Sequence, residues 1–331
     1  MIWYPLKITT PLRQHVFGGH LIQEKVGKQN LPAQAVAETW EISDVDGDIS
    51  VITNGEFAGK SLRDVVQQYP DEMVAAGWRG PRFPLLTKFI DGSGMLPVHV
   101  HADDATAKEK YGEPNGKTEA WHILWAAPDA TFLGGIKPGV GKEELKKALL
   151  EQDYDRVLVR TAVRTGETVY VPAGTIHSFG PNALIYEVEQ TSNIQQHAMP
   201  YRMENGEKLT RSEWEKNIDS LLAELHWDSR PQVLQGTLSE EGGALRCFCC
   251  AGSYFKLERV TTRCAGRMEF DGAIVLTNMG EVFQLETKGV TESIEHAETA
   301  LLPAACMNVD VPPRQELLLT YLPQTTLNFT Q

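Results

Sequence analysis

A pair of histidines separated by one residue is the feature of the sequence that points most directly to chemistry. His99 and His101 stand in the segment 96–104, next to Val98 and Val100. In an extended strand, alternate side chains face the same way, so the two imidazoles would project from one face, roughly 6.6 Å apart along the strand. Two imidazoles placed in this way can bind one transition-metal ion. An exposed strand with two unrelated histidines has the same spacing, so the pair alone leaves both interpretations open.

Two more donors extend this pattern. Glu119 enters a strand-like run, and His177 follows a turn that contains proline and glycine. Three imidazoles and one carboxylate would complete a metal site. Their order along the chain, H-x-H, then a glutamate, then a histidine after P-x-G-x-x-H, resembles the two metal motifs of the cupin superfamily. That resemblance implies an ion inside a jelly-roll barrel, held by His99, His101, Glu119 and His177. His122 is left out, because its in/out phase on the strand is opposite to that of Glu119.

The elements that must position these residues follow from the periodicity of the chain. Short β-branched or aromatic runs, separated by glycine and proline turns, occupy residues 157–159, 168–171 and 183–188. Such spacing is typical of an antiparallel sandwich or barrel. Apolar residues at helical spacing predict helices at about residues 61–76, 141–152 and 210–226. The last of them begins with a capping-box signature from Thr210 to Glu213.

A change of pattern after the last helix divides the chain into two units. Further β runs follow at residues 245–251, 274–277, 282–285 and 317–321. We therefore predict a mainly β protein with a metal-binding cupin jelly-roll barrel at residues 1–235, which contains the helical insertions. Residues 236–331 are predicted to form a smaller, second cupin-like β domain. A length of 331 residues agrees with one large domain or two.

Composition and charge exclude several classes of function. The chain has 31 basic and 44 acidic residues, a net charge of −13, so we expect no nucleic-acid partner. It has no apolar run as long as a membrane span and no N-terminal signal pattern, which predicts a cytoplasmic protein without membrane association. The odd number of cysteines, 5, argues against a disulfide framework, and Cys247 and Cys250 are interpreted as structural thiols. Residues 138–142 lack the spacing of a phosphate loop.

Several segments around the metal motifs make the resemblance more specific. They are residues 17–19, 37–43, 84–91, 116–121 and 172–177. In order and spacing they are similar to successive signatures of the type I mannose-6-phosphate isomerases, especially the short bacterial form. The likeness covers about residues 10–200. It implies an aldose–ketose isomerase that interconverts mannose 6-phosphate and fructose 6-phosphate, or a related sugar.

By this resemblance the family's zinc ligands fall on the four residues named above. Lys117 matches the family's active-site lysine, and Lys88 matches the lysine of its P-L-L-x-K segment. Both lysines would meet an anionic group such as a phosphate. The nitrogen-rich donor set favours zinc, although it also accepts iron, manganese, cobalt or nickel.

The sequence departs from the family pattern in two places. The family has glutamine where this chain has His99, and imidazole is a stronger and softer ligand, so metal binding is expected to survive and to tighten. The family also has a catalytic arginine about twenty residues beyond its last metal histidine. That distance leads here to Gln196 or His197. Arg202 lies further along and could take the role only if the intervening loop bulges.

The resemblance implies a reaction that moves a proton between C1 and C2 of a sugar while negative charge develops on the sugar oxygens. A divalent ion that binds those oxygens stabilises that charge. A base must then carry the proton. The candidates are Glu187, Glu189, Lys117 with a lowered pKa, and His197 in the place of the missing arginine, and the sequence does not rank them.

Two other functions stay open at this point. A metal-cupin oxygenase or epimerase acting on a non-phosphorylated substrate is favoured by the three-histidine ligand set. A non-catalytic sugar-binding cupin is favoured by the missing arginine. The bound metal tests the oxygenase alternative, because iron that consumes oxygen would favour it. Saturable sugar binding without turnover would favour the non-catalytic cupin. The sequence does not predict the oligomeric state.

Overall fold

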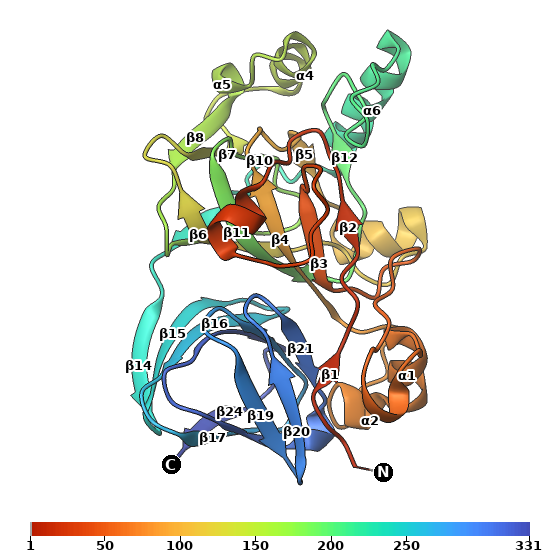
Figure 1. The fold of residues 1–331 in the computed structure, drawn as a ribbon. Coiled ribbons are helices and arrows are strands. Elements are labelled where there is room, and N and C mark those ends of the chain that lie inside the picture. The colour runs from red at the N-terminus through yellow and green to blue at the C-terminus, as the bar shows by residue number, and fades with distance from the viewer. Residues whose placement is uncertain (1) are drawn as a thin grey trace.

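The computed structural model describes residues 2–331 as two stacked β units, each built from a seven-stranded sheet and a five-stranded sheet (Figure 1). The pairings between named strands are antiparallel, from β1–β21 to β7–β8. The predicted fold class, a mainly β cupin barrel with helical insertions and a second β unit, is confirmed. No helix of residues 2–331 is both long and apolar enough to cross a membrane.

The first unit holds the segments that carry the predicted ligands. Its larger sheet has the order β13-β9-β6-β11-β4-β3-β2, with β2 (Leu12–Arg13), β3 (Glu38–Ile42), β4 (Leu85–Gly92), β6 (Glu119–Ala126), β9 (Thr168–Val171), β11 (Ala183–Gln190) and β13 (Gln232–Leu234). Its smaller sheet has the order β12-β5-β10-β7-β8, with β5 (His99–Val100), β7 (Thr131–Ile136), β8 (Leu158–Ala162), β10 (His177–Phe179) and β12 (Gln196–His197). The β-branched and aromatic runs of the sequence therefore become the two walls of one barrel.

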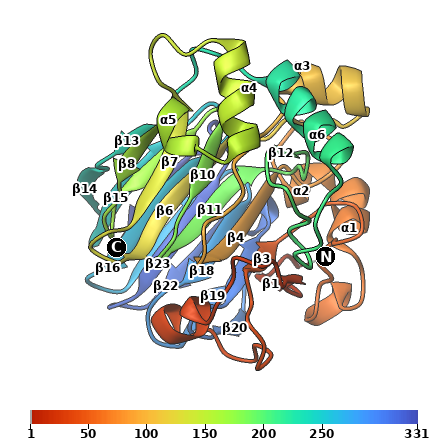
Figure 2. The same cartoon turned by 90° about the horizontal axis from the view of Figure 1, so that it is seen from above.

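The helices lie outside the barrel (Figures 1 and 2). They are α1 (Leu62–Gln68), α2 (Pro70–Met73), α3 (Asp104–Thr106), α4 (Lys142–Glu151), α5 (Tyr154–Val157) and α6 (Arg211–Glu224), with short helical turns η1 (Ile22–Val26), η2 (Gly55–Phe57), η3 (Ala107–Tyr111) and η4 (Ala304–Cys306). The three predicted helices are present, but the first is divided into α1 and α2. Pro70 causes this break, because proline has no backbone N–H to continue α1 and suits the first turn of α2. The capping box at Thr210 and Glu213 is formed as expected.

The second unit repeats the two-sheet plan. One sheet has the order β1-β21-β18-β23-β16-β15-β14, with β1 (Leu6–Lys7), β14 (Thr237–Glu241), β15 (Ala244–Ala251), β16 (Lys256–Thr262), β18 (Ile274–Asn278), β21 (Thr299–Leu302) and β23 (Glu316–Tyr321). The other has the order β20-β19-β22-β17-β24, with β17 (Gly266–Phe270), β19 (Phe283–Thr287), β20 (Val290–Ile294), β22 (Asn308–Val311) and β24 (Leu327–Thr330). The five cysteines are free thiols.

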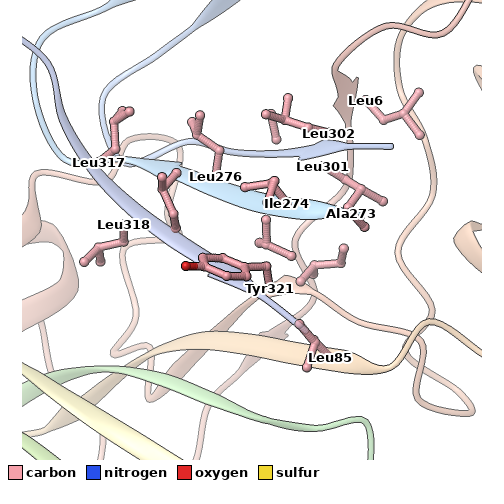
Figure 3. Close-up of a cluster of buried hydrophobic side chains, with 14 of the residues drawn as sticks. Leu6, Leu85, Ala273, Ile274, Leu276, Leu301, Leu302, Leu317, Leu318 and Tyr321 are labelled. Atoms are coloured by element: carbon pink, nitrogen blue, oxygen red, sulfur yellow. The ribbon is translucent and has the colours of Figure 1, made fainter. Parts of the chain in front are cut away.

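The N-terminal strand ties the two units together. β1 pairs with β21 of the second unit, so that Leu6 lies opposite Leu301. The predicted division at residue 235 lies between β13 and β14, whereas β1, in the predicted first domain, pairs with a strand of the second unit. A two-residue strand carries too little pattern for its pairing to be predicted from sequence. Figure 3 shows Leu85 of β4 beside Tyr321 of β23 in the same apolar cluster. The larger sheet of the first unit, which carries Glu119 and Glu187, therefore packs against the second unit through a shared apolar core.

Candidate metal centre and active-site pocket

The four predicted ligands meet between the two sheets of the first barrel. His99 lies on β5 and His101 just after it, Glu119 begins β6, and His177 begins β10. Their ligand atoms all lie within 4.8 Å of one another. β10 pairs with β5 so that His177 lies directly opposite His99. All four side chains are buried.

Local backbone structure explains how the distant histidine reaches the others. The turn between β9 and β10 contains Gly174, whose φ of +79° is favoured only for glycine. A Cβ at this position would also lie 2.3 Å from the ring of His226. The turn therefore reverses the chain closely enough for β10 to bring His177 to the face of the barrel that already holds His99 and His101.

Backbone carbonyl groups orient all three imidazoles in the same way. Each ring donates its Nδ1–H to a carbonyl oxygen: His99 to Pro97 at 2.6 Å, His101 to Ile194 at 2.9 Å, and His177 to Thr175 at 2.8 Å. A carbonyl can only accept a hydrogen bond, so the proton of each neutral ring resides on Nδ1. The three Nε2 atoms are left as lone-pair donors that face a common centre, the arrangement that second-shell hydrogen bonds give to metal-bound histidines.

The atoms that face one another in this centre are unprotonated nitrogens and carboxylate oxygens, an arrangement that a bound cation would stabilise. Nε2 of His99 lies 3.0 Å from Nε2 of His101, and neither atom carries a proton to share. Nε2 of His177 is buried without a hydrogen-bond partner in residues 2–331. Burial, reinforced by the neighbouring charged groups, lowers the pKa of His99 well below its ordinary value and that of His101 to about 4, so both rings are neutral. Neutral imidazoles and an ionised carboxylate fit a divalent transition metal.

His122 lies outside this cluster, as its strand phase predicts. Its Nδ1 is 3.0 Å from Oγ1 of Thr168, and it belongs to neither group of potential metal ligands found among residues 2–331. Burial lowers the pKa of His122 to about 4.

This buried histidine predicts a measurable loss of stability in acid. The unfolded chain protonates His122 near its ordinary pKa of 6.5, whereas the folded protein does not do so until about 4. The unfolded state therefore binds more protons in this window, and the free energy of unfolding falls as the pH drops through it. Between pH values of about 7 and 5, His122→Gln should lose about 2 kcal/mol less than the wild type in urea unfolding. The exposed His20→Gln serves as control, and equal losses in all three proteins would contradict the assignment.

A second group of charged side chains lies beside the metal ligands. Glu187 and Glu189 project from β11, the central strand of the larger sheet, and Lys88 comes from β4 beside it. Lys117 Nζ lies 2.7 Å from Glu189 Oε2 and 3.0 Å from Glu119 Oε2. Lys88 Nζ lies 3.0 Å from Glu189 Oε1 and 3.1 Å from Glu187 Oε2. All five side chains are buried, so their charges interact strongly.

The interactions within this group shift the pKa values of Glu187, Glu189 and Lys117 in different directions. Burial alone would raise the pKa of Glu187, but the charges of Lys117 and Lys88 hold it below its ordinary value. Burial and the charge of Glu187 raise the pKa of Glu189 well above its ordinary value. Burial opposes protonation of Lys117, yet the surrounding glutamates raise its pKa well above its ordinary value. The surrounding carboxylates thus favour the charged form of Lys117, whereas the lowered pKa expected from sequence depends on the charge of a bound ion. Glu187 is therefore ionised, and Glu189 is the carboxyl group of the pair that takes up a proton more readily.

A pocket connects this chemistry with solvent. Its buried part is lined by His99, Glu119, Lys88, Lys117 and Glu187. Its more exposed part includes Arg13, His15, Asn193, Gln195 and Glu204. A small polar molecule that entered the pocket would contact His99 and Glu119 of the candidate metal centre together with the ionised Glu187.

The structure also places the residues proposed to replace the family's arginine. His197 lies on β12 opposite His99 in the strand register and is half-buried, but it does not line the pocket. Arg202 is 51% exposed and faces Glu207 and Glu213, outside the pocket lining. The intervening loop thus directs Arg202 toward solvent.

Sequence reasoning missed several residues of the pocket. Arg13 and His15 belong to a segment with only two residues in a strand, which offers no periodic signal. Glu38 and Trp40 were noted only as part of a family segment, although Glu38 Oε2 accepts a hydrogen bond from Trp40 Nε1 at 2.7 Å inside the pocket. Alternation along β3 could have placed both side chains on one face.

Comparisons with known proteins find relatives named mannose-6-phosphate isomerase. The chain is 32% identical over 189 residues to the mannose-6-phosphate isomerase of Streptococcus mutans, a match that spans 57% of the chain and 58% of that protein. It is 30% identical over 216 residues to mannose-6-phosphate isomerase ManA of Bacillus subtilis, which spans 65% and 67%. No family model matches the chain.

Solved structures share the fold over nearly the whole chain. The mannose 6-phosphate isomerase crystal structure from Bacillus subtilis has a TM-score of 0.85 at 23% identity and covers 96% of this chain and 99% of its own. A mannose 6-phosphate isomerase bound with zinc and yttrium has a TM-score of 0.71 at 16% identity, with coverages of 96% and 99%.

A pair of facing β-sheets that buries such a ligand cluster between them defines the protein as a cupin. Within that class, the chain belongs to the mannose-6-phosphate isomerase family. The proteins that give this family its name are aldose–ketose isomerases.

Proposed function

We propose that this protein is a metal-dependent aldose–ketose isomerase that interconverts mannose 6-phosphate and fructose 6-phosphate. One observation carries the proposal: His99 and Glu119 of the candidate metal-ligand cluster line the same pocket as an ionised glutamate, Glu187. The choice of mannose 6-phosphate as substrate rests on the names of the relatives described above. Their matched lengths, 58% and 67% of those proteins, leave the activity of this chain to be measured.

The metal site would be formed by His99, His101, Glu119 and His177. A bound divalent ion would supply Lewis-acid stabilisation of the charge that develops on the sugar oxygens. Zinc is proposed because three nitrogen donors and one carboxylate suit it, and because a fold neighbour binds zinc.

The side chains of the pocket divide the remaining tasks. Glu187 is ionised and lines the pocket, so it is the base that takes the proton from one sugar carbon and returns it to the next. Lys117 keeps its positive charge and lies 3.2 Å from Nε2 of His101, where it would stabilise negative charge on a substrate oxygen. Glu189 is fully buried below them and acts as a proton-holding support.

Isomerisation can be followed directly by NMR. Zinc-loaded protein mixed with mannose 6-phosphate in D₂O should produce fructose 6-phosphate and should incorporate deuterium at C2 of the remaining mannose 6-phosphate when the base exchanges its proton with solvent. Product without deuterium would point to transfer shielded from solvent within the same mechanism. The proposal is contradicted if zinc-loaded protein gives no product from mannose 6-phosphate.

A second candidate function is a metal-cupin oxygenase, and His99 is the observation that favours it. Three buried imidazoles and one carboxylate also suit redox-active iron. Iron-loaded protein that consumes oxygen with a non-phosphorylated sugar, while the zinc form is inactive, would support this alternative.

A further inference from the structure

The two lysines predicted to meet a phosphate are already engaged by carboxylates. Lys88 lies within 4 Å of carboxylate oxygens of Glu38, Glu187 and Glu189, and Lys117 within 4 Å of those of Glu119, Glu187 and Glu189. Each of the two ammonium groups is therefore already paired with three buried carboxyl groups, so neither lysine is a free cation for a phosphate group. A phosphate group would need a cation elsewhere in the pocket.

Arg13 is the arginine that lines this pocket. It lies on β2, where its backbone pairs with that of Glu38 on β3. Its guanidinium carbon is 4.5 Å from the centre of the Trp40 ring, and Nζ of Lys88 is 4.9 Å from the same centre. Trp40 therefore links Arg13 to the reactive end of the pocket and fixes the plane of the guanidinium by stacking. Arg13 also forms an ion pair, but with one carboxylate, Asp48, where each lysine faces three. The carbonyl of Leu12 accepts a hydrogen bond from its other terminal nitrogen, and the remaining N–H groups of the guanidinium are left for a ligand.

His15 lies two residues from Arg13 and lines the same pocket. Its Nδ1 is buried without a hydrogen-bond partner in residues 2–331. Its ring packs 5.5 Å from the ring of Phe17, and Nε2 is 3.8 Å from Oε1 of Glu38. A buried ring nitrogen without a partner is costly unless a ligand or a water satisfies it. Arg13 and His15 thus offer two polar groups at the solvent-facing part of a pocket whose far end holds the metal ligands.

We infer that Arg13 and His15 form the subsite for the phosphate of the sugar substrate, and that they set the preference for a phosphorylated over a free sugar. The inference rests on the proposed function for the identity of the sugar. The planar fork of Arg13 is suited to two hydrogen bonds with phosphate oxygens, and His15, two residues after β2 ends, adds a third contact. Glu204, an exposed carboxylate of the same pocket, opposes the dianion and limits the affinity.

The test compares the affinities of zinc-loaded protein for mannose 6-phosphate and for mannose by calorimetry. The wild type should bind the phosphorylated sugar about 10- to 100-fold more tightly. Arg13→Gln and His15→Gln should reduce this ratio, the arginine variant to near one, while zinc content stays unchanged. Glu204→Gln should increase it.

Arg211→Gln provides a matched control. Arg211 also stacks on a tryptophan, with its guanidinium carbon 5.3 Å from the Trp214 ring, and pairs with Glu215 at 2.6 Å, but it lies on α6 outside the pocket lining. It should keep the wild-type ratio.

The outcomes separate the subsite from the function. A wild type that prefers the phosphorylated sugar but does not isomerise it, with the preference lost in Arg13→Gln, supports the subsite and contradicts the proposed function. A wild type that isomerises mannose 6-phosphate while Arg13→Gln and His15→Gln both keep its binding ratio overturns the subsite alone. Equal affinities for the two sugars in the wild type also overturn it.

Discussion

Replacement of His177 by alanine should remove the bound metal and lower turnover of mannose 6-phosphate by about 10³-fold or more, because Lewis-acid stabilisation of the developing charge depends on the ion. His177 is buried, and its Nδ1–H donates to the carbonyl of Thr175. Its Nε2 therefore faces the centre of the cluster. Metal content by mass spectrometry and turnover by NMR should fall together.

His226→Ala is the matched control for this variant. His226 also contacts a carboxylate, with Nε2 3.2 Å from Oδ2 of Asp103, but it is half exposed and outside the cluster. It should keep its metal and most of its activity. Full turnover by a metal-free His177→Ala protein would contradict the assignment of the site.

Replacement of Glu187 by glutamine should lower kcat by about 10²- to 10⁴-fold and leave metal content unchanged. The amide keeps the size of the carboxylate and can still accept the hydrogen bond that Trp121 Nε1 donates at 3.1 Å. It cannot accept a proton from the substrate. Steady-state kinetics with zinc-loaded protein measure this effect, and binding of mannose 6-phosphate should change much less than kcat.

Glu189→Gln tests the assignment of protons within the pair. Because burial and the charge of Glu187 raise the pKa of Glu189 and favour its protonated form, an amide resembles that form in shape and charge. Its kcat should stay within about 10-fold of the wild-type value. If Glu189→Gln loses as much activity as Glu187→Gln, or more, the roles of the two glutamates are reversed.

The ligand set could be predicted from sequence because each ligand belongs to a strong local pattern. The H-x-H spacing places His99 and His101 on one face of a strand, and the opposite phase of His122 agrees with its position against Thr168, outside the cluster. That Glu119 and His177 join them depends on strand pairing over long separations, which periodicity does not encode. The resemblance to a family supplied this information, and the antiparallel register of β5 and β10 now gives its physical basis.

Other features required three-dimensional structure. The proton on Lys117 follows from glutamates that come from β6 and β11, so its raised pKa could not be read from its neighbours in sequence. Arg13 gave no signal because β2 has only two residues, and its role depends on stacking against Trp40 of β3. The break between α1 and α2 could have been predicted, since Pro70 interrupts the expected helix.

Anomalous X-ray diffraction from crystals of the protein, purified without chelators and collected at the zinc absorption edge, tests the central claim most directly. We predict one strong peak between β5, β6 and β10, at about 2.1 Å from Nε2 of each of the three histidines and from a carboxylate oxygen of Glu119. Crystals grown with added zinc that show no peak at these four side chains would contradict the account.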